Sequence, residues 1–528
     1  MRDFQLPGRS TVYARGGMAA TSHPFATLAA LEILRRGGNA VDAAIAACAV
    51  QGVVEPQSTG IGGDCFALFA PASGGVVALN GSGWAPAAAS SERLSALGLE
   101  RIEAESPHSV TVPGAVAAWE LLQRQHGRLS FAEVLEPAIG YARDGFPVFP
   151  RVAFDWQRGE ARLRRTPAAA DAYLPGGAAP APGQIVRLPA LARTLEILAQ
   201  RGAEAFYRGE LASRMVATLK GLGGLHEEAD FAEFAPEFVK PIHASYRDIL
   251  VYECPPNGQG LVTLLMLNIL EQFDLGRLDP HGAERFHLEA EATRLAFRDR
   301  DAFLADPRHA PVPLEELLDK AYAAKLAKCI DPERAIGNLP PPLLRDVGNT
   351  VYIAVVDEER NACSFINSLY DNFGSGICCP ETGVLFHCRG RAFRLDPGHP
   401  NLVAPRKRPM HTIIPGLAFR GGELWACFGV MGADYQPVGH VHLLTNLVDF
   451  GMDPQTALDS PRVMAYPQDL LVERGVRPDV RAALATKGHR VVESETPHGG
   501  GQCILVDHRR NLLIGGSDPR KDGIALGW

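Results

Sequence analysis

Long apolar runs, a basic block and a secretion signal are all missing from this 528-residue sequence. No stretch reaches the roughly 18 consecutive apolar residues that a membrane-spanning helix needs. The net charge of −8, from 52 basic and 60 acidic residues, does not suit a protein whose main partner is nucleic acid or an anionic membrane. The first residues lack the apolar segment of a signal peptide, and we therefore expect a cytoplasmic protein.

Cysteine is also scarce, with ten residues and no Cys-x-x-Cys pair. This excludes a disulfide scaffold and argues against a structural zinc site. His440 and His442 are discounted as metal ligands, because side chains two positions apart on a predicted helix face away from each other. We predict neither a metal nor an organic cofactor.

Apolar periodicity predicts helices and strands in alternating blocks. A first helix is expected to begin at a Ser22 cap and to end at Gly37. The other predicted helices cover 41–50, 114–126, 131–143, 189–201, 262–273, 284–304, 437–450 and 477–487. The predicted strands cover 65–69, 351–356, 362–368, 489–494, 502–507 and 511–515. This mixture predicts a layered α/β or α+β fold.

Three consecutive prolines, at 340–342, deny a helix or a central strand to residues 331–349. We expect this stretch to be an exposed connector. Thr350 follows it directly, at the start of a predicted strand. A threonine hydroxyl becomes a good nucleophile when a free α-amine on the same residue acts as its base. That amine requires a cut just before Thr350, although a β-favouring threonine that merely opens a strand is the simpler interpretation.

Three further features give weaker signals. A hairpin turn centred on Glu359 would place Ser368 opposite Thr350, with Cβ atoms roughly 5 Å apart. The backbone N–H groups of Gly432 and Ala433, in a glycine loop before a helix, suit an oxyanion hole or a plain turn. Arg389 lies in an arginine cluster, where one side chain inside a site would suit a substrate carboxylate.

Several longer motifs occur in an order that is specific to one family. They are Ala19–Pro24, Arg36–Ala44, Thr111–Val116, Glu253–Pro256, Lys407–Pro409 and Gly516–Arg520. On these motifs the chain resembles the γ-glutamyltransferase (γ-glutamyltranspeptidase) family of N-terminal nucleophile hydrolases, over nearly its whole length.

The resemblance implies a four-layer αββα sandwich and a proenzyme that cuts itself between Asn349 and Thr350. The large subunit, 1–349, and the small subunit, 350–528, would stay associated as one structural domain. A homodimer of such two-subunit units is left open. Thr350 would be the nucleophile and its own amine the base. Ser368 would hydrogen-bond the nucleophile, and Gly432 with Ala433 would form the oxyanion hole.

The departures from the family pattern concern the substrate. Glutathione-cleaving members hold the glutamyl carboxylate with an arginine where this chain has Ser82, and the amino group with an aspartate where it has Ala392. Arg389 replaces a glutamine, and His411-Thr412 replaces a pair of serines. These changes suggest a small amide whose acyl group carries a carboxylate but no amine. The chain is most similar to the oxamate amidohydrolase branch, which converts oxamate to oxalate and ammonia in purine-ring catabolism.

Four alternatives stay open. The enzyme could be a γ-glutamyl hydrolase or transferase of the glutathione type with relocated anchors, or a dicarboxylic acylase. It could instead be a relative that binds a small acid and never matures. A cofactor-binding α/β protein, suggested by the glycine loops alone, is the weakest alternative.

Overall fold

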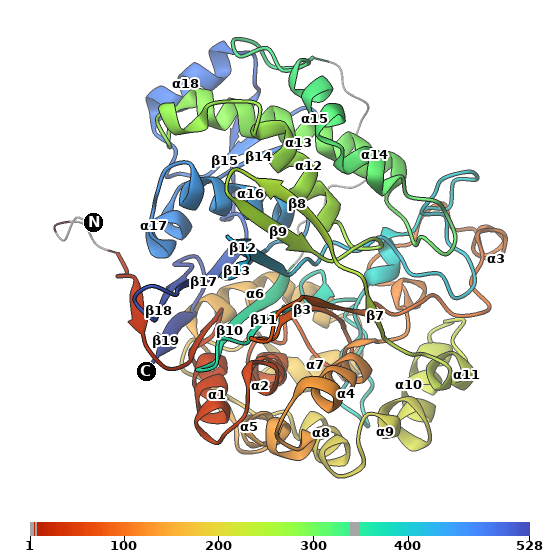
Figure 1. Cartoon of the computed structure of the whole chain (residues 1–528). Coiled ribbons are helices and arrows are strands. Elements are labelled where there is room, and N and C mark those ends of the chain that lie inside the picture. Colours follow the sequence, from red (N-terminus) through yellow and green to blue (C-terminus); the bar gives the residue numbers. More distant parts are fainter. Residues whose placement is uncertain (1–4, 6–7, 338–348) are drawn as a thin grey trace.

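The computed structural model describes residues 5, 8–337 and 349–528, and two seven-stranded sheets lie at its centre (Figure 1). The first has the order β1 (Val12–Ala14), β18 (Leu512–Ser517), β17 (Gly500–Asp507), β13 (Glu423–Met431), β12 (Gly416–Arg420), β9 (Ile249–Glu253) and β8 (Ile242–Tyr246). The second has the order β19 (Ile524–Gly527), β2 (Met18–Thr21), β10 (Asn349–Val356), β11 (Ala362–Tyr370), β3 (Asp64–Ala70), β4 (Val77–Gly81) and β7 (Glu237–Val239). We call them the β13 sheet and the β10 sheet. Each combines strands from before and after Thr350.

Helices cover the outer face of each sheet (Figure 1). Those on the side of the β10 sheet include α1 (Pro24–Arg35), α2 (Ala40–Val54), α4 (Ala115–His126), α5 (Phe131–Asp144) and α8 (Pro189–Arg201). Those on the side of the β13 sheet include α12 (Gly260–Leu270), α13 (Ala283–Phe303), α15 (Lys320–Ala327), α16 (Tyr435–Val448) and α17 (Pro454–Asp459).

The remaining elements are short or peripheral. The helices are α3 (Ser91–Ala96), α6 (Pro150–Leu163), α7 (Pro167–Tyr173), α9 (Glu204–Tyr207), α10 (Glu210–Gly221), α11 (Glu228–Ala232), α14 (Leu314–Leu318) and α18 (Pro478–Thr486). The 3₁₀ turns are η1 (Pro107–Ser109), η2 (Pro175–Gly177), η3 (Leu275–Arg277) and η4 (Arg389–Ala392). Two small sheets join β14 (Val463–Ala465), β15 (Leu470–Val472) and β16 (Val491–Glu493), and β5 (Phe146–Pro147) with β6 (Ile185–Val186). Within the described ranges, no helix combines the length and the apolar character needed to cross a membrane.

Three apolar layers hold the four structural layers together. One cluster lies between the outer helices and the β10 sheet, a second between the two sheets, and a third between the β13 sheet and its helices. All nine residues of β11 are buried, because both faces of this strand are covered. The expected four-layer αββα fold is thus confirmed.

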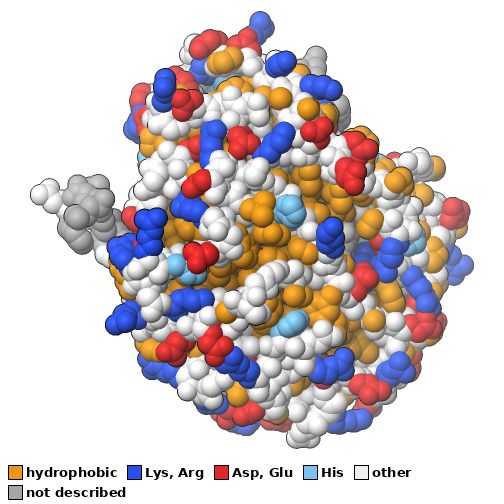
Figure 2. Space-filling view, in the orientation of Figure 1, with side chains coloured by type: hydrophobic (Ala, Val, Ile, Leu, Met, Phe, Trp, Pro, Cys, Tyr) orange, Lys and Arg blue, Asp and Glu red, His pale blue; other side chains and the backbone are white. Residues whose placement is uncertain are grey.

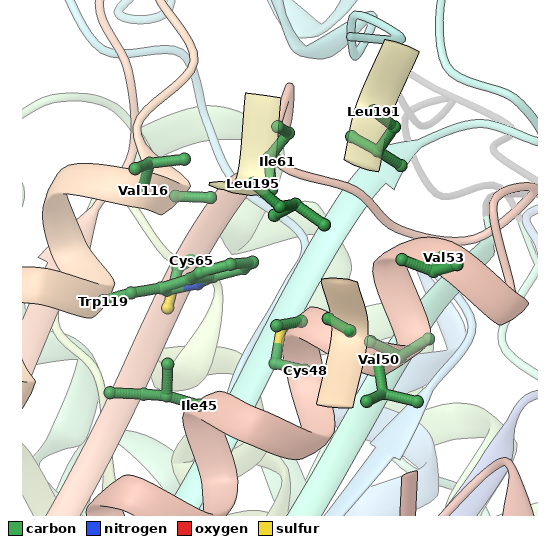
Figure 3. Packing of buried hydrophobic residues seen from close by; sticks show 14 of the residues in the cluster. Ile45, Cys48, Val50, Val53, Ile61, Cys65, Val116, Trp119, Leu191 and Leu195 are labelled. Carbon is green, nitrogen blue, oxygen red and sulfur yellow. The ribbon is translucent and has the colours of Figure 1, made fainter. Parts of the chain in front are cut away.

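Helix α2 shows how the outer layer is built. All fifteen of its residues are buried, as its apolar composition on every side requires. Figure 3 shows Cys48, Val50 and Val53 of this helix in the cluster that also holds Cys65 of β3 and Trp119 of α4. Small alanines fill half of the other positions of α2, so the helix can lie close to β10 and β11.

The predicted cap of α1 and the predicted end of the connector need correction, and several helices were not predicted. His23, not Ser22, caps α1, because the Ser22 hydroxyl donates to the buried Glu55 carboxylate at 2.6 Å. Helix α6 was not predicted at all. Residues 338–348 of the predicted connector lie outside the described residues. Its start at 331–337 can be placed, and Asn349 belongs to β10 rather than to the connector.

Figure 2 shows one face of the molecule, in the orientation of Figure 1. Apolar side chains form a band across the middle of this face, between the two helical layers. Acidic and basic side chains are interspersed above and below the band. The surface pattern therefore follows the layering of the fold.

Candidate active site

Thr350 lies at the start of β10, a central strand of its sheet, and only 1% of its surface is exposed. Its hydroxyl is 3.1 Å from the hydroxyl of Ser368 on the neighbouring strand β11. The contact expected from the hairpin is therefore present. The Ser368 oxygen also accepts the backbone N–H of Tyr370 at 2.8 Å, and this bond holds the serine hydroxyl in place beside the threonine.

The loop that contains Gly432 and Ala433 lies at the same end of the sandwich as Thr350. Across the inter-sheet layer, the Tyr352 ring lies against Gly429, and the Cys427 thiol contacts the backbone of Val355. Strands β10 and β13 therefore run in opposite directions, and the end of β13 meets the start of β10. Among the described residues, the backbone N–H groups of Gly432 and Ala433 have no acceptor. They are available to an oxyanion.

Contacts on two sides hold this loop in shape. The Gln259 amide donates to the carbonyls of both Thr412 and Ala433, at 2.7 and 3.0 Å. On the other side, a side chain at position 432 would come within 2.8 Å of the Gly499 α-carbon. Only glycine fits there, and its φ of 125° also favours glycine.

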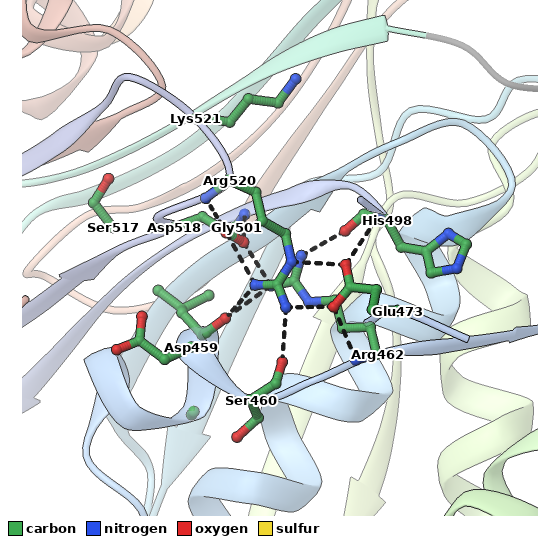
Figure 4. Close-up of polar contacts among 12 residues, drawn as sticks. Asp459, Ser460, Arg462, Glu473, His498, Gly501, Ser517, Asp518, Arg520 and Lys521 are labelled. Atoms are coloured by element: carbon green, nitrogen blue, oxygen red, sulfur yellow. Dashed lines mark hydrogen bonds and ion pairs between the residues drawn. The ribbon is translucent and has the colours of Figure 1, made fainter. Parts of the chain in front are cut away.

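A buried ion-pair network supports the segment around Gly499 (Figure 4). Asp518 accepts the Gly501 N–H and pairs with Arg462, at 2.7 and 2.5 Å. Glu473 accepts the His498 N–H at 2.9 Å and pairs with Arg520. The network fixes both ends of the segment that packs against Gly432, so it positions the candidate oxyanion loop.

Arg389 is fully buried in η4 and lies close to Tyr370. Its guanidinium lies over the Tyr370 ring, 4.1 Å from the centroid. It donates to the Thr412 hydroxyl at 2.9 Å, and its Nε is 3.7 Å from the Asp64 carboxylate. That separation allows an ion pair but exceeds hydrogen-bond length.

Asp64 joins this group, although it was not predicted. It is fully buried, stands opposite Ser368 in the register of β3 and β11, and accepts the Gly83 N–H at 2.9 Å. One of its oxygens lies 2.9 Å from His411 Nε2 and 3.0 Å from His387 Nδ1. Burial alone would raise the pKa of Asp64, but the two histidines outweigh burial and bring this pKa below its usual range.

Burial also lowers the pKa of His411 to about 3, and Arg389 acts in the same direction. His411 is therefore a neutral imidazole at pH 7, and its Nε2–H donates to Asp64. Its ring also makes an edge contact with Phe66, at a centroid distance of 4.8 Å. These contacts fix the orientation of His411 beside Thr412.

Replacing Asp64 with asparagine is expected to lower the free energy of unfolding at pH 7 by about 3 kcal/mol. The substitution removes a buried negative charge and leaves its buried partners without it. The native pKa of Asp64 lies below its unfolded value of about 3.9. Its stabilisation is thus present above pH 4 and is lost as the pH falls through the native pKa. The gap between wild type and variant, measured by thermal unfolding, should narrow below pH 4.

The exposed Asp144, paired with Arg143, offers a control for this measurement. Asp144→Asn should leave the unfolding midpoint nearly unchanged at both pH values. An Asp64→Asn protein as stable as wild type at pH 7 would show that Asp64 does not hold this cluster together.

Ser82 is buried next to the same group but is committed to other contacts. Its hydroxyl accepts the Asn257 amide at 3.0 Å, and its carbonyl accepts the Arg408 Nε–H at 2.9 Å. The Asn257 backbone carbonyl in turn accepts the His411 N–H at 2.8 Å. The structure thus brings Ser82 into the wall of the site, with Asn257 as a further residue that was not predicted.

A cavity of about 250 Å³ opens beside the candidate oxyanion loop. Its lining combines Met431 and Gly432 with the apolar Met464 and Leu471. Basic side chains also line it, namely Arg151, Arg158 and Lys521. Arg151 is paired with Asp155 at 2.8 Å. The cavity can therefore hold a partly apolar group that carries a negative charge.

Comparison with known proteins gives the same picture over the whole chain. The family model of gamma-glutamyltranspeptidase matches residues 26–528. The chain belongs to the gamma-glutamyltranspeptidase family. It is thus an enzyme of a family of self-processing N-terminal nucleophile hydrolases.

Three known proteins are similar to this gamma-glutamyltranspeptidase family member over nearly the full length of both chains. The "Glutathione hydrolase-like YwrD proenzyme" of Bacillus subtilis (strain 168) is 39% identical, over 97% of this chain and 98% of that protein. The "Oxamate amidohydrolase proenzyme" of Klebsiella pneumoniae is 36% identical, over 97% and 98%. The crystal structure of a cephalosporin acylase from Bacillus halodurans has a TM-score of 0.94 at 40% identity, over 100% and 99%.

Proposed function

We propose that this protein cuts itself between Asn349 and Thr350 and then hydrolyses small amides whose acyl group carries a carboxylate. Our first choice of substrate is oxamate, which would give oxalate and ammonia. The proposal rests on one observation above all. The guanidinium of Arg389 stacks on Tyr370, two residues along β11 from the serine that contacts Thr350. An arginine so placed suits a carboxylate attached directly to the amide carbon.

The reaction we propose has two steps after maturation. The Thr350 amine takes the hydroxyl proton while Oγ1 attacks the amide carbon, and the N–H groups of Gly432 and Ala433 hold the oxyanion. The C–N bond then breaks, and the leaving amine takes the proton from the Thr350 ammonium. Water, activated by the same amine, attacks the resulting ester and releases the acid.

Maturation would use the same hydroxyl. Oγ1 of Thr350 attacks the Asn349 carbonyl carbon, the peptide C–N bond breaks, and the acyl group moves from nitrogen to oxygen. Breaking the C–N bond frees the Thr350 amine, which takes the hydroxyl proton, and hydrolysis of the ester leaves a carboxylate on Asn349 and restores the Thr350 hydroxyl. The small subunit 350–528 thus begins with its own base.

A panel of three substrates tests the acyl group. We expect ammonia release from oxamate at millimolar concentration, with weaker turnover of glutaryl amides and least turnover of γ-glutamyl-anilide. The glutamyl amine finds Ala392 where an aspartate would be needed, and an unpaired buried charge costs several kcal/mol. Substrate-dependent ammonia or amine release, measured by a coupled assay, gives kcat/KM for each compound. No release of ammonia from oxamate would refute the oxamate assignment.

The cavity beside Gly432 favours a second candidate, a dicarboxylic acylase. Ammonia leaves that cavity of about 250 Å³ unused, whereas a bulky amine fills it. A higher kcat/KM for a glutaryl amide of a large, acidic amine than for oxamate would favour this function. Preferred turnover of γ-glutamyl-anilide would instead favour the glutathione type with relocated anchors.

A further inference from the structure

Three ligand-type side chains meet in a buried cluster at α13. His287 and Glu291 are one helical turn apart on this helix, and His489 comes from the segment between α18 and β16. Their candidate donor atoms all lie within 4.8 Å of one another. His287 and Glu291 are 0% exposed and His489 is 3% exposed. None of these side chains takes part in the mechanism proposed above.

The hydrogen bonds around His287 prepare its inner nitrogen for a metal. Nε2 is 2.8 Å from the Asp331 carbonyl, which accepts only, so Nε2 carries the proton. Nδ1 then holds a lone pair and faces His489 Nε2 at 2.8 Å. A carbonyl that fixes the outer nitrogen of a histidine is the usual support of a metal ligand.

His489 is also suited to this role. Its Nε2 donates to His287 Nδ1 in the absence of a metal, and the tautomer with the proton on Nδ1, which has no hydrogen-bond partner among the described residues, would give Nε2 a lone pair for an ion. Two nitrogens bound to one tetrahedral zinc ion lie roughly 3.4 Å apart. The rings would need to separate by roughly half an ångström, and His489 follows Gly488, whose φ is 95°, in a connecting segment.

The charges around the cluster select among metals. Glu291 pairs with Arg294 at 3.1 Å, and Lys487 stands two residues before His489 in the chain. These cations neutralise the negative charge of the Glu291 carboxylate. A hard ion such as Ca²⁺ or Mg²⁺, whose binding depends on negatively charged oxygen ligands, would therefore bind weakly at this site. Imidazole nitrogens bind zinc and related ions without a net negative site.

We propose that His287, His489 and Glu291 bind a divalent transition-metal ion of the zinc type, with the fourth position left to water. Each Glu291 oxygen keeps a lone pair after its bonds to Ile336 N–H and Arg294. The site joins residues from both sides of the proposed cut. If the chain is cut as the proposed function requires, the ion would bridge the large and the small subunit.

The site also contacts the start of the connector. His287 holds the Asp331 carbonyl, Glu291 accepts the Ile336 N–H at 2.6 Å, and the Ala335 N–H donates to the Lys487 carbonyl at 2.7 Å. A bound ion would therefore stiffen the anchor of the segment that leads to Thr350.

Calorimetric titration of untagged, EDTA-treated protein with ZnCl₂ tests the binding, and elemental analysis after desalting gives the retained zinc. We expect one equivalent per chain, and no binding of MgCl₂. Affinity should fall at least tenfold in His287→Gln/His489→Gln, whose glutamines can still hydrogen-bond. Cys329→Ser removes the exposed thiol nearby and should bind zinc as wild type does.

Circular dichroism and metal-free unfolding midpoints show whether each variant is folded, and His287→Gln alone replaces the double variant if that one is not. Less than one fifth of an equivalent on wild type, or equal zinc affinity in the folded variant, overturns the site. For cut protein, zinc should raise the urea concentration that separates the subunits, and no rise overturns the bridge. A chain that never cuts refutes the proposed function while the zinc titration still decides the site.

Discussion

Thr350→Ala is expected to leave the chain in one piece and to abolish amide hydrolysis. The variant loses the hydroxyl that contacts Ser368 at the start of β10, and an uncut chain has no free amine at position 350 to act as base. Wild type should give two fragments, 1–349 and 350–528, on a denaturing gel. Intact mass and N-terminal sequencing of the smaller fragment, which should begin at Thr350, complete the measurement.

Two variants make this result specific. Thr350→Ser keeps a hydroxyl and should still cut, with slower hydrolysis. Thr218→Ala removes a surface threonine of α10, whose hydroxyl donates to the Arg214 carbonyl in the same helix, and should behave as wild type. A single uncut band from wild type would mean that the base never forms, and the protein would then be a non-maturing relative that binds a small acid.

Arg389→Met is expected to lower kcat/KM for oxamate at least 100-fold. A substrate carboxylate would lose its cation in a fully buried site, which costs about 3 kcal/mol or more. Arg389→Lys should recover only part of the loss, since an ammonium lacks the planar fork that grips a carboxylate. Steady-state kinetics on oxamate and on oxamide, which replaces the carboxylate with a neutral amide, separate charge recognition from general damage.

Arg391→Met is the matched control, because Arg391 lies in the same short helix but pairs with Asp371 at 2.6 Å. It should leave the ratio of oxamate to oxamide turnover unchanged. The ratio should collapse only when Arg389 is replaced. Equal losses for oxamate and oxamide in Arg389→Met would remove this residue from carboxylate recognition.

The parts of the site that the sequence could predict are local. Thr350 and Ser368 belong to one hairpin, so the position of the turn alone sets which residues face each other. The glycine loop at 432 is likewise visible as a break between a strand and a helix. Long buried helices such as α2 and α13 follow from apolar content and periodicity.

Asp64 and His387 could not be predicted, because what brings them together is not local. Asp64 reaches Ser368 only through the pairing of β3 with β11, which are about 300 residues apart in the chain. The acid opens an apolar strand, and an unpaired carboxylate there would be costly. The cost of an unpaired carboxylate predicts that Asp64 has a buried partner, but it does not identify which residue that partner is. The predicted Ser22 cap is wrong for a similar reason, because the Ser22 hydroxyl donates a hydrogen bond to the distant, buried Glu55.

Both sheets combine strands from before and after Thr350, and this affects how the protein folds and how long it stays folded. In the β10 sheet, β10 lies between β2 from the early part of the chain and β11 from the late part, and the β13 sheet is interleaved in the same way. If the backbone is cut before Thr350, as we propose, neither piece keeps a complete sheet. Folding must therefore precede cutting, and a denatured cut enzyme faces a two-body reassembly in which open strand edges compete by aggregation. Each molecule folds as a single chain only once, and its later persistence depends on the rate of unfolding rather than on an equilibrium.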